Sequence, residues 1–171
     1  PDVYHNLGVL LLHDGQLEPA AIAFALALEL TPDAPWTRAG LGLALGRCGL
    51  RVNLRRLMMI DSLDMTAADR KRILAACKAS KASRIVITHG TDTMVETARL
   101  LGPASRKKTI VLTGAMVPYK FGSSDGLFNL GSALSFVQTL PPGVYVAMNG
   151  RCFPYDRVRK DRSRGIFVAA A

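Results

Sequence analysis

Residues 84–101 read RIVITHGTDTMVETARLL, and this stretch indicates the fold of the second part of the chain. Its first five residues, Arg84–Thr88, are mostly apolar and β-branched, which predicts a short buried strand. The sequence Thr93-Met94-Val95-Glu96 resembles a capping box, in which a threonine begins a helix and the acidic residue three positions later completes the cap. This helix is predicted to end at Leu101. A strand followed at once by a helix is half of a βαβ unit, so the stretch predicts a parallel sheet.

The alternation of strands and helices continues on both sides of this stretch. The predicted strands are Leu54–Ile60, Arg84–Thr88, Thr109–Thr113 and Val144–Met148. A capping box at Thr66 predicts a helix to about Ala79. A later helix is predicted from Ser124 or Asp125 to Thr139. Short apolar strands separated by helices are typical of an α/β fold, here a doubly wound, mostly parallel sheet with helices on both faces.

The first fifty residues follow a different pattern, with apolar residues at helical spacing and an internal repeat. Leu7-Gly8 recurs as Leu41-Gly42, and Gly15 recurs as Gly49, each 34 residues later. This is the period of the tetratricopeptide repeat (TPR), and small residues fall at its close-packing positions. Residues 3–35 therefore resemble one such repeat, and residues 36–49 resemble the first helix of a second.

Length and charge agree with a chain of two parts. The chain has 171 residues, enough for one domain and a small appendage. Residues 1–50 carry two basic and five acidic side chains, whereas residues 51–171 carry 20 basic and eight acidic ones. We therefore predict a TPR-like α-helical hairpin over residues 1–50 and an α/β domain over residues 51–171. An unrelated helical hairpin is the alternative for the first part.

Composition excludes several classes of protein. With 49% hydrophobic and 20% charged residues, the chain is too apolar for intrinsic disorder. It has no run of about 18 uncharged apolar residues, so no membrane span is expected. Its three cysteines are far apart and form no CxxC pair, so we expect no metal site, a reducing compartment and a cytoplasmic location.

The stretch Arg151–Arg164 is the most basic part of the chain and is predicted to be irregular up to Gly165. Its positive charge and its two aromatic residues, Phe153 and Tyr155, are compatible with an anionic partner. However, the stretch contains no recognised nucleic-acid motif. A solvated basic face is the favoured interpretation, so nucleic-acid binding is not expected.

Polar residues gather where the predicted strands end, and ligands bind outside the carboxyl ends of strands in open parallel sheets. The segments at these ends are Asp61–Asp64, His89–Thr93, Gly114–Met116 and Asn149–Gly150. Thr91 and Asp92 precede a helix N-terminus, where free N–H groups favour anions, whereas Thr93 is expected only to cap the helix. His89 has no second histidine at ligand spacing, so we expect a structural histidine. Neither GxGxxG nor a Walker A loop occurs, so no nucleotide cofactor is expected.

Five short motifs of the second part form a specific combination. They are DSLDM (Asp61–Met65), VITHGTDTMVETA (Val86–Ala98), VLTGAMVP (Val111–Pro118), SSDGLFNL (Ser123–Leu130) and AMNG (Ala147–Gly150). Together they resemble the bacterial-type L-asparaginases over about residues 52–168, and the short, single-domain members in particular. The resemblance implies hydrolysis of the side-chain amide of L-asparagine, or of glutamine in some members, without a metal or organic cofactor.

The resemblance also implies roles for five residues. Thr91 matches the second active-site threonine of the family, and Asp92 matches the carboxylate beside it, which also holds the α-amino group of the substrate. Lys160 aligns with the lysine that completes this catalytic set. Ser62 matches a residue that binds the α-carboxylate, and Ala115 matches a position whose backbone faces the side-chain amide. A threonine hydroxyl needs a base to act as a nucleophile, and a lysine amine can be that base.

The sequence departs from the family pattern in three respects. The opening strand and loop of the family, TGGTI, carries the usual primary nucleophile and occurs nowhere in these residues. We therefore expect a sheet without its first strand. Leu63 stands where many relatives have a polar residue that contacts the substrate. The second domain, which in larger members lends groups to a neighbouring subunit, is also missing, although the resemblance still implies a homo-oligomer.

Three other interpretations stay open. Without the first threonine, the chain could be a catalytically silent fusion whose TPR-like helices bind a protein partner. A related amidase task is a second alternative, because tRNA-dependent amidotransferases carry similar ammonia-releasing domains. An anionic partner of the basic stretch is the third. The principal prediction is an asparaginase-type amidohydrolase that uses a threonine nucleophile.

Overall fold

A computed structural model of the chain divides into two compact units, Pro1–Leu57 and Met58–Ala171. It describes residues 2–16, 20, 23–24, 52–105, 107–117 and 124–170. The predicted boundary between residues 50 and 51 lies close to the division of the two units and stays a prediction.

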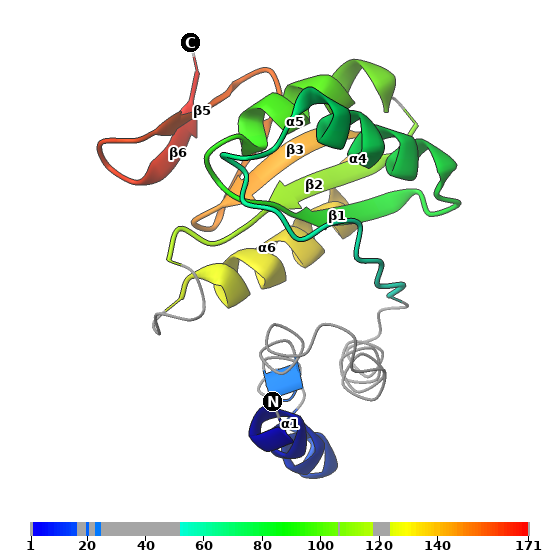
Figure 1. The fold of residues 1–171 in the computed structure, drawn as a ribbon, viewed down its shortest axis with the longest axis vertical. Helices are drawn as coiled ribbons and strands as arrows, with labels where there is room; N and C mark the ends of the chain where they lie inside the picture. The colour runs from blue at the N-terminus through cyan, green and yellow to red at the C-terminus, as the bar shows by residue number, and fades with distance from the viewer. Residues whose placement is uncertain are drawn as a thin grey trace. The chain divides into compact units, whose positions relative to one another are not determined.

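The described part of the first unit is mainly α1, Asp2–His13 (Figure 1). The helix ends just before Gly15, whose φ of 74° is the left-handed conformation that often terminates a helix. A Cβ on Gly8 would lie 2.8 Å from the ring of Phe24, so this glycine allows a close contact between two helical segments. Most of the second half of the predicted hairpin and the start of its second repeat lie outside the described residues.

The second unit contains a four-stranded sheet. Its strands are β1 (Arg84–Thr88), β2 (Thr109–Thr113), β3 (Gly143–Met148) and β4 (Arg151–Pro154). They lie in the order β1-β2-β3-β4. β1, β2 and β3 are parallel, and only β4 runs antiparallel to its neighbour. The predicted mostly parallel sheet is therefore confirmed, with the bounds of β1 and β2 as predicted.

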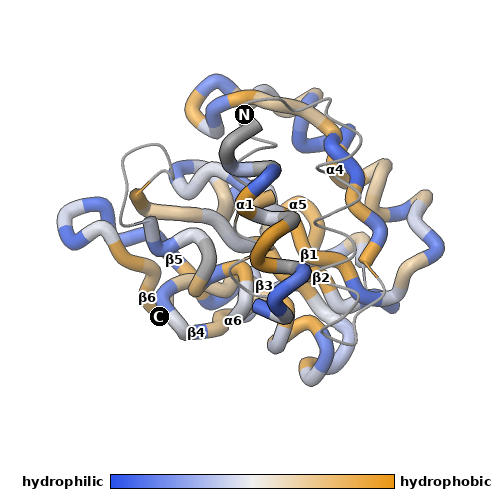
Figure 2. Tube along the Cα trace, turned by 90° about the horizontal axis from the view of Figure 1, so that it is seen from below, coloured by the Kyte–Doolittle hydropathy of each residue, from blue (hydrophilic) through white to orange (hydrophobic). Residues whose placement is uncertain are grey.

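Helices cover both faces of this sheet. α4 (Ala67–Ala79) and α5 (Met94–Leu101) lie on one face, and α6 (Gly126–Thr139) lies on the other (Figure 1). A short 3₁₀ helix, η1 (Gly102–Ala104), follows α5. β1 and β2 read RIVIT and TIVLT, with hydrophobic residues between their polar ends (Figure 2). All five residues of β2 are buried, because this strand is central and covered on both faces.

The predicted strand Leu54–Ile60 is wrong. The structure has no strand over residues 52–61, and the side chains of Leu54, Met59 and Ile60 are exposed. A strand needs a neighbour for its backbone hydrogen bonds, and an apolar run alone does not provide one. Among the described residues, β1 pairs only with β2, so β1 forms one edge of the sheet.

The predicted irregular structure of the stretch Arg151–Arg164 is also wrong. After β4, the chain forms a separate antiparallel pair, β5 (Val158–Asp161) and β6 (Ile166–Ala169). Val158 and Phe167 are buried, while the arginines around them are exposed. In a strand only alternate side chains face the core, so a strand can contain many charged residues on its exposed side. The high charge of this stretch therefore obscured the alternation of buried and exposed residues.

Gly114, which follows β2, is a site where added volume should destabilise the fold. A Cβ at this position would overlap the backbone carbonyl oxygen of His89, which cannot move as a side chain can. We expect Gly114→Ala to lower the free energy of unfolding by about 3 kcal/mol. Gly131 in α6 is the matched control, because its Cβ would meet nothing within 4 Å.

The control substitution, Gly131→Ala, should change the free energy of unfolding in the opposite direction. Alanine is favoured over glycine inside a helix, so Gly131→Ala should raise the free energy of unfolding by about 0.5–1 kcal/mol. Urea unfolding followed by circular dichroism measures both values. Equal stability of the two variants would contradict the close contact of Gly114 with His89.

Candidate functional site

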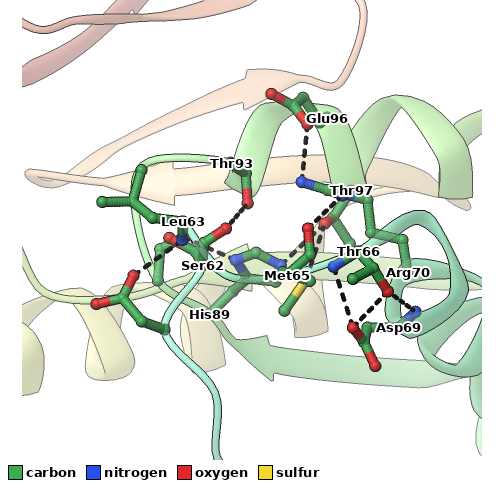
Figure 3. Close-up of polar contacts among 12 residues, drawn as sticks. Ser62, Leu63, Met65, Thr66, Asp69, Arg70, His89, Thr93, Glu96 and Thr97 are labelled. Carbon is green, nitrogen blue, oxygen red and sulfur yellow. Dashed lines mark hydrogen bonds and ion pairs between the residues drawn. The ribbon is translucent and has the colours of Figure 1, made fainter.

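His89 is the first residue after β1, and both its backbone and its side chain form hydrogen bonds that stabilise the following loop. The backbone N–H of His89 donates to the carbonyl oxygen of Thr113, at 2.8 Å, which continues the pairing of β1 with β2. Its Nδ1 lies 2.7 Å from the carbonyl oxygen of Gly90, and its Nε2 lies 2.9 Å from Oγ1 of Thr97 (Figure 3). These contacts are satisfied when Nδ1 donates and Nε2 accepts, in the neutral ring. The prediction of a structural histidine is confirmed.

Thr93 has a different role from the predicted one. It precedes α5, but its side chain makes no capping hydrogen bond, so the predicted capping box is wrong. Instead, Oγ1 of Thr93 donates to the carbonyl oxygen of Ser62, at 2.8 Å (Figure 3). Glu96, the other half of the predicted box, forms an ion pair with Arg70 at 2.8 Å. The capping box of Thr66 with Asp69 is confirmed.

The threonine, aspartate and lysine of the predicted catalytic set lie together. Nζ of Lys160 is 2.8 Å from Oγ1 of Thr91 and 2.8 Å from Oδ1 of Asp92. Thr91 is buried, and the side chain of Lys160 is only 11% exposed, whereas that of Asp92 is 34% exposed. Lys160 comes from β5, 69 residues after Thr91. The lysine is therefore part of a polar cluster and does not belong to a solvated basic face.

Contacts between α5 and the chain around β5 help to position Lys160. A guanidinium nitrogen of Arg99 donates to the carbonyl oxygen of Val158, at 3.5 Å. The ring of Tyr155 occupies the place that a Cβ on Gly102 would take. These two contacts fix β5 against the end of α5, and Val158, two residues before the lysine, is fully buried.

The other two predicted site residues lie in segments that contact the loop after β1. Ser62 is buried, and a Cβ on Gly90 would come within 2.6 Å of its Oγ. Ala115 directly follows Gly114, which packs against the carbonyl oxygen of His89. His89–Thr93 and Gly114–Met116 thus meet at the carboxyl ends of β1 and β2, where ligands bind in parallel sheets, and Asp61–Asp64 contacts the same loop although it follows no strand.

The arrangement of Thr91, Asp92 and Lys160 allows proton transfer and contact with a ligand. A hydroxyl oxygen and an amine nitrogen at 2.8 Å can exchange a proton directly. The carboxylate of Asp92 lies beside the same amine and retains enough exposure to contact a ligand. Within the described part of the chain, no three His, Cys, Asp or Glu side chains converge as metal ligands would. No helix in that part is long and apolar enough to cross a membrane.

Two further residues near the site, Asp125 and Asn129, make contacts that the sequence pattern does not predict. Of the two residues predicted to cap α6, Ser124 accepts a hydrogen bond from the N–H of Gly126 at 3.1 Å, whereas the side chain of Asp125 makes no cap and instead accepts from the backbone N–H groups of Met116 and Val117. No role is predicted for Asn129, which is completely buried in the structure. An asparagine four residues after an aspartate, within an apolar helix, is the signal that could have indicated a polar contact here.

The burial of His89 predicts a pH dependence of stability. Burial lowers the pKa of His89 below its ordinary value of 6.5, and the positive charge of Arg70 lowers it further. The unfolded chain therefore binds this proton at a higher pH than the folded chain does. We expect the free energy of unfolding to fall as the pH is lowered below about 6.5.

Unfolding experiments between about pH 8 and pH 5 measure this effect. His89→Gln should reduce the loss of stability toward acid pH. His13, whose side chain is 88% exposed, is the matched control, and His13→Gln should leave the slope unchanged. A slope that is the same in the chain and in His89→Gln would contradict the assignment.

A mostly parallel α/β domain with a threonine, an aspartate and a lysine at the ends of its strands is typical of a hydrolase with a hydroxyl nucleophile. Comparisons with known proteins show to which family the chain belongs. The family model described as asparaginase, N-terminal, matches residues 29–167, which is more than half of the chain. The chain therefore belongs to the asparaginase family.

Individual relatives agree with this assignment. The chain is 43% identical over 84 residues to an L-asparaginase of Thermococcus kodakarensis, covering 48% of this chain and 26% of that protein. It is 40% identical over 102 residues to L-asparaginase 2 of Escherichia coli (strain K12), covering 57% and 28%. The solved thermostable L-asparaginase from Thermococcus kodakarensis matches with a TM-score of 0.63 and 32% identity, over 74% of this chain and 42% of that chain. The chain thus spans less than half the length of these relatives.

Proposed function

We propose that the α/β domain hydrolyses the side-chain amide of L-asparagine to L-aspartate and ammonia. The observation that carries this proposal is the position of Lys160 Nζ, 2.8 Å from the hydroxyl of Thr91 and 2.8 Å from the carboxylate of Asp92. A nucleophile and a base within hydrogen-bond distance of each other are the elements that amide hydrolysis requires. The relatives named L-asparaginase support the choice of substrate.

The proposed reaction has two steps. Oγ1 of Thr91 attacks the amide carbon while the neutral amine of Lys160 takes the hydroxyl proton. The carbon–nitrogen bond then breaks, and this proton passes to the leaving nitrogen, so that ammonia departs and aspartate remains as an ester of Thr91. Water hydrolyses the ester and restores the hydroxyl, with Lys160 again moving the proton.

The remaining residues hold the substrate. Asp92 binds the α-amino group, since its carboxylate is beside the reacting hydroxyl and is one-third exposed. Ser62 binds the α-carboxylate, and the backbone of Ala115 faces the side-chain amide. No metal or organic cofactor takes part in this scheme. A cytoplasmic location and a homo-oligomer are parts of the same proposal.

The experiment that tests the proposed function is an assay of the purified chain with L-asparagine. Ammonia and L-aspartate released in equal amounts would support it, and comparison with L-glutamine would define the preferred amide. Expression in a host without its own asparaginases removes the main source of contaminating activity. A folded chain that releases no ammonia from either amide would refute the proposal.

A second candidate function concerns residues 3–35, which we propose form a TPR-like repeat that binds a protein partner. The supporting observation is the contact between Gly8 and Phe24, because this repeat needs a small residue where its two helices cross. NMR chemical shifts of the full chain test the structural part. They should show two helices separated at Gly15, and a single continuous helix would refute this repeat.

A further inference from the structure

Asn129 on α6 joins three segments at the carboxyl ends of the strands. Its Nδ2 donates to the carbonyl oxygen of Gly114, at 2.9 Å, and to Oδ2 of Asp125, at 2.8 Å. Its Oδ1 accepts from the backbone N–H of Asn149, at 2.8 Å, in the turn between β3 and β4. The side chain is fully buried, and both its amide nitrogen and its oxygen have partners. A buried and fully bonded amide of this kind holds its neighbours in one arrangement.

The partners of this amide include both ends of the turn that contains Ala115. On one side, the carbonyl of Gly114 is bonded to Asn129. On the other side, the N–H of Met116 donates to Oδ1 of Asp125, at 2.8 Å, and the N–H of Val117 donates to the same oxygen, at 3.1 Å. Asp125 is itself held by Asn129.

Peptide planarity makes these bonds decisive for Ala115. In a trans peptide, the carbonyl of one residue and the N–H of the next point in opposite directions. The bonded carbonyl of Gly114 therefore directs the N–H of Ala115 away from Asn129. The bonded N–H of Met116 likewise directs the carbonyl of Ala115 away from Asp125. Both polar groups of Ala115 are therefore oriented, and neither has a hydrogen-bond partner among the described residues.

We propose that Asn129, acting through Asp125, is a positioning residue that orients the backbone of Ala115 for the amide group of the substrate. Among the described residues, Asn129 and Asp125 make the hydrogen bonds that fix the two peptide units around Ala115. It also joins them to Asn149, whose φ of 54° is unusual for a residue other than glycine. The ligand part of this inference rests on the proposed function, whereas the orientation of the two peptide units does not.

The test is the substitution Asn129→Asp, which keeps the shape of the side chain and replaces its donor by an acceptor. That acceptor would face the carbonyl of Gly114 and the carboxylate of Asp125, so both bonds should be lost. Gln138→Glu is the matched control. It makes the same change of amide to carboxylate on the same helix, where the amide donates only to the carbonyl oxygen of Leu134. If Asn129→Asp does not fold, Asp125→Ala removes the acceptor of Met116 and Val117 instead.

Two measurements separate positioning from general stability. Hydrogen exchange of the Met116 and Val117 amides should become about tenfold faster or more in the variant and stay unchanged in the control. The KM for L-asparagine should rise about tenfold with a much smaller change in kcat, because a contact equal in ground state and transition state affects KM.

The exchange rates and the kinetic constants together show whether the positioning role of Asn129 or the proposed function is wrong. Unchanged exchange of the two amides would overturn the proposal, and so would faster exchange with an unchanged KM, which indicates a purely structural role. A wild-type chain that releases no ammonia would refute the proposed function alone, because the exchange rates still show whether Asn129 orients the turn.

Discussion

Replacing Thr91 by alanine should reduce ammonia release from L-asparagine by about a thousandfold or more. The substitution removes the only hydroxyl within hydrogen-bond distance of the Lys160 amine among the described residues. Without this oxygen, the first carbon–oxygen bond of the proposed reaction cannot form. Steady-state release of ammonia by the purified chain and variant measures the loss.

The serine substitution at the same position is the control for Thr91→Ala. Thr91→Ser keeps a hydroxyl near Lys160 and removes only a methyl group from a buried site, so it should keep a large part of the activity. Circular dichroism must show that both variants remain folded. If Thr91→Ala releases ammonia at the wild-type rate, Thr91 is not the nucleophile and Lys160 does not act by taking its hydroxyl proton.

Replacing Lys160 by methionine should lower the same activity by about 10²–10⁴-fold, the range that is typical for a general base. Methionine has a similar length and fits an 11% exposed site, but it cannot accept a proton. The change also removes the hydrogen bond that Lys160 Nζ donates to the Asp92 carboxylate. The measurement is kcat for L-asparagine hydrolysis, together with the thermal unfolding midpoint.

Lys108 provides the matched control for this substitution. It is also a partly buried lysine, and its Nζ donates to the carbonyl oxygens of Cys77 and Ser80. However, it precedes β2 and lies at the amino end of that strand, opposite to the candidate site. Lys108→Met should lower stability and leave kcat nearly unchanged. Equal losses of kcat in Lys160→Met and Lys108→Met would show that Lys160 affects the activity only through the stability of the fold.

Much of the fold could be predicted because it depends on neighbours in sequence. The bounds of β1 and β2 follow from five-residue apolar runs, and the start of α4 follows from a hydrogen-bonded pair of residues three positions apart. The same reasoning from neighbouring residues wrongly predicts a capping box formed by Thr93 and Glu96. Their spacing fits a capping box, but their side chains bond to Ser62 and Arg70 instead. A local motif is therefore reliable only when no distant partner competes for the same groups.

The candidate site was predictable in its residues and unpredictable in its geometry. Thr91 and Asp92 stand out because they follow a strand and precede a helix. Lys160 has no such signal, since it belongs to a basic stretch in which burial alternates from residue to residue. Only the pairing of β5 with β6 turns its side chain inward, toward Thr91.

The sequence by itself determined the three parallel strands β1, β2 and β3, the helix that begins after Thr66, the α/β class and the identity of the polar residues that follow these strands. The tertiary structure alone decided which of these residues meet. It left Leu54–Ile60 without a strand partner, joined Lys160 to a threonine 69 residues away, and made Asn129 a buried link around Ala115. The physical reason is the range of the interactions. Backbone propensities and caps act over a few residues, whereas ladder pairing and buried polar contacts exist only when distant segments are packed together.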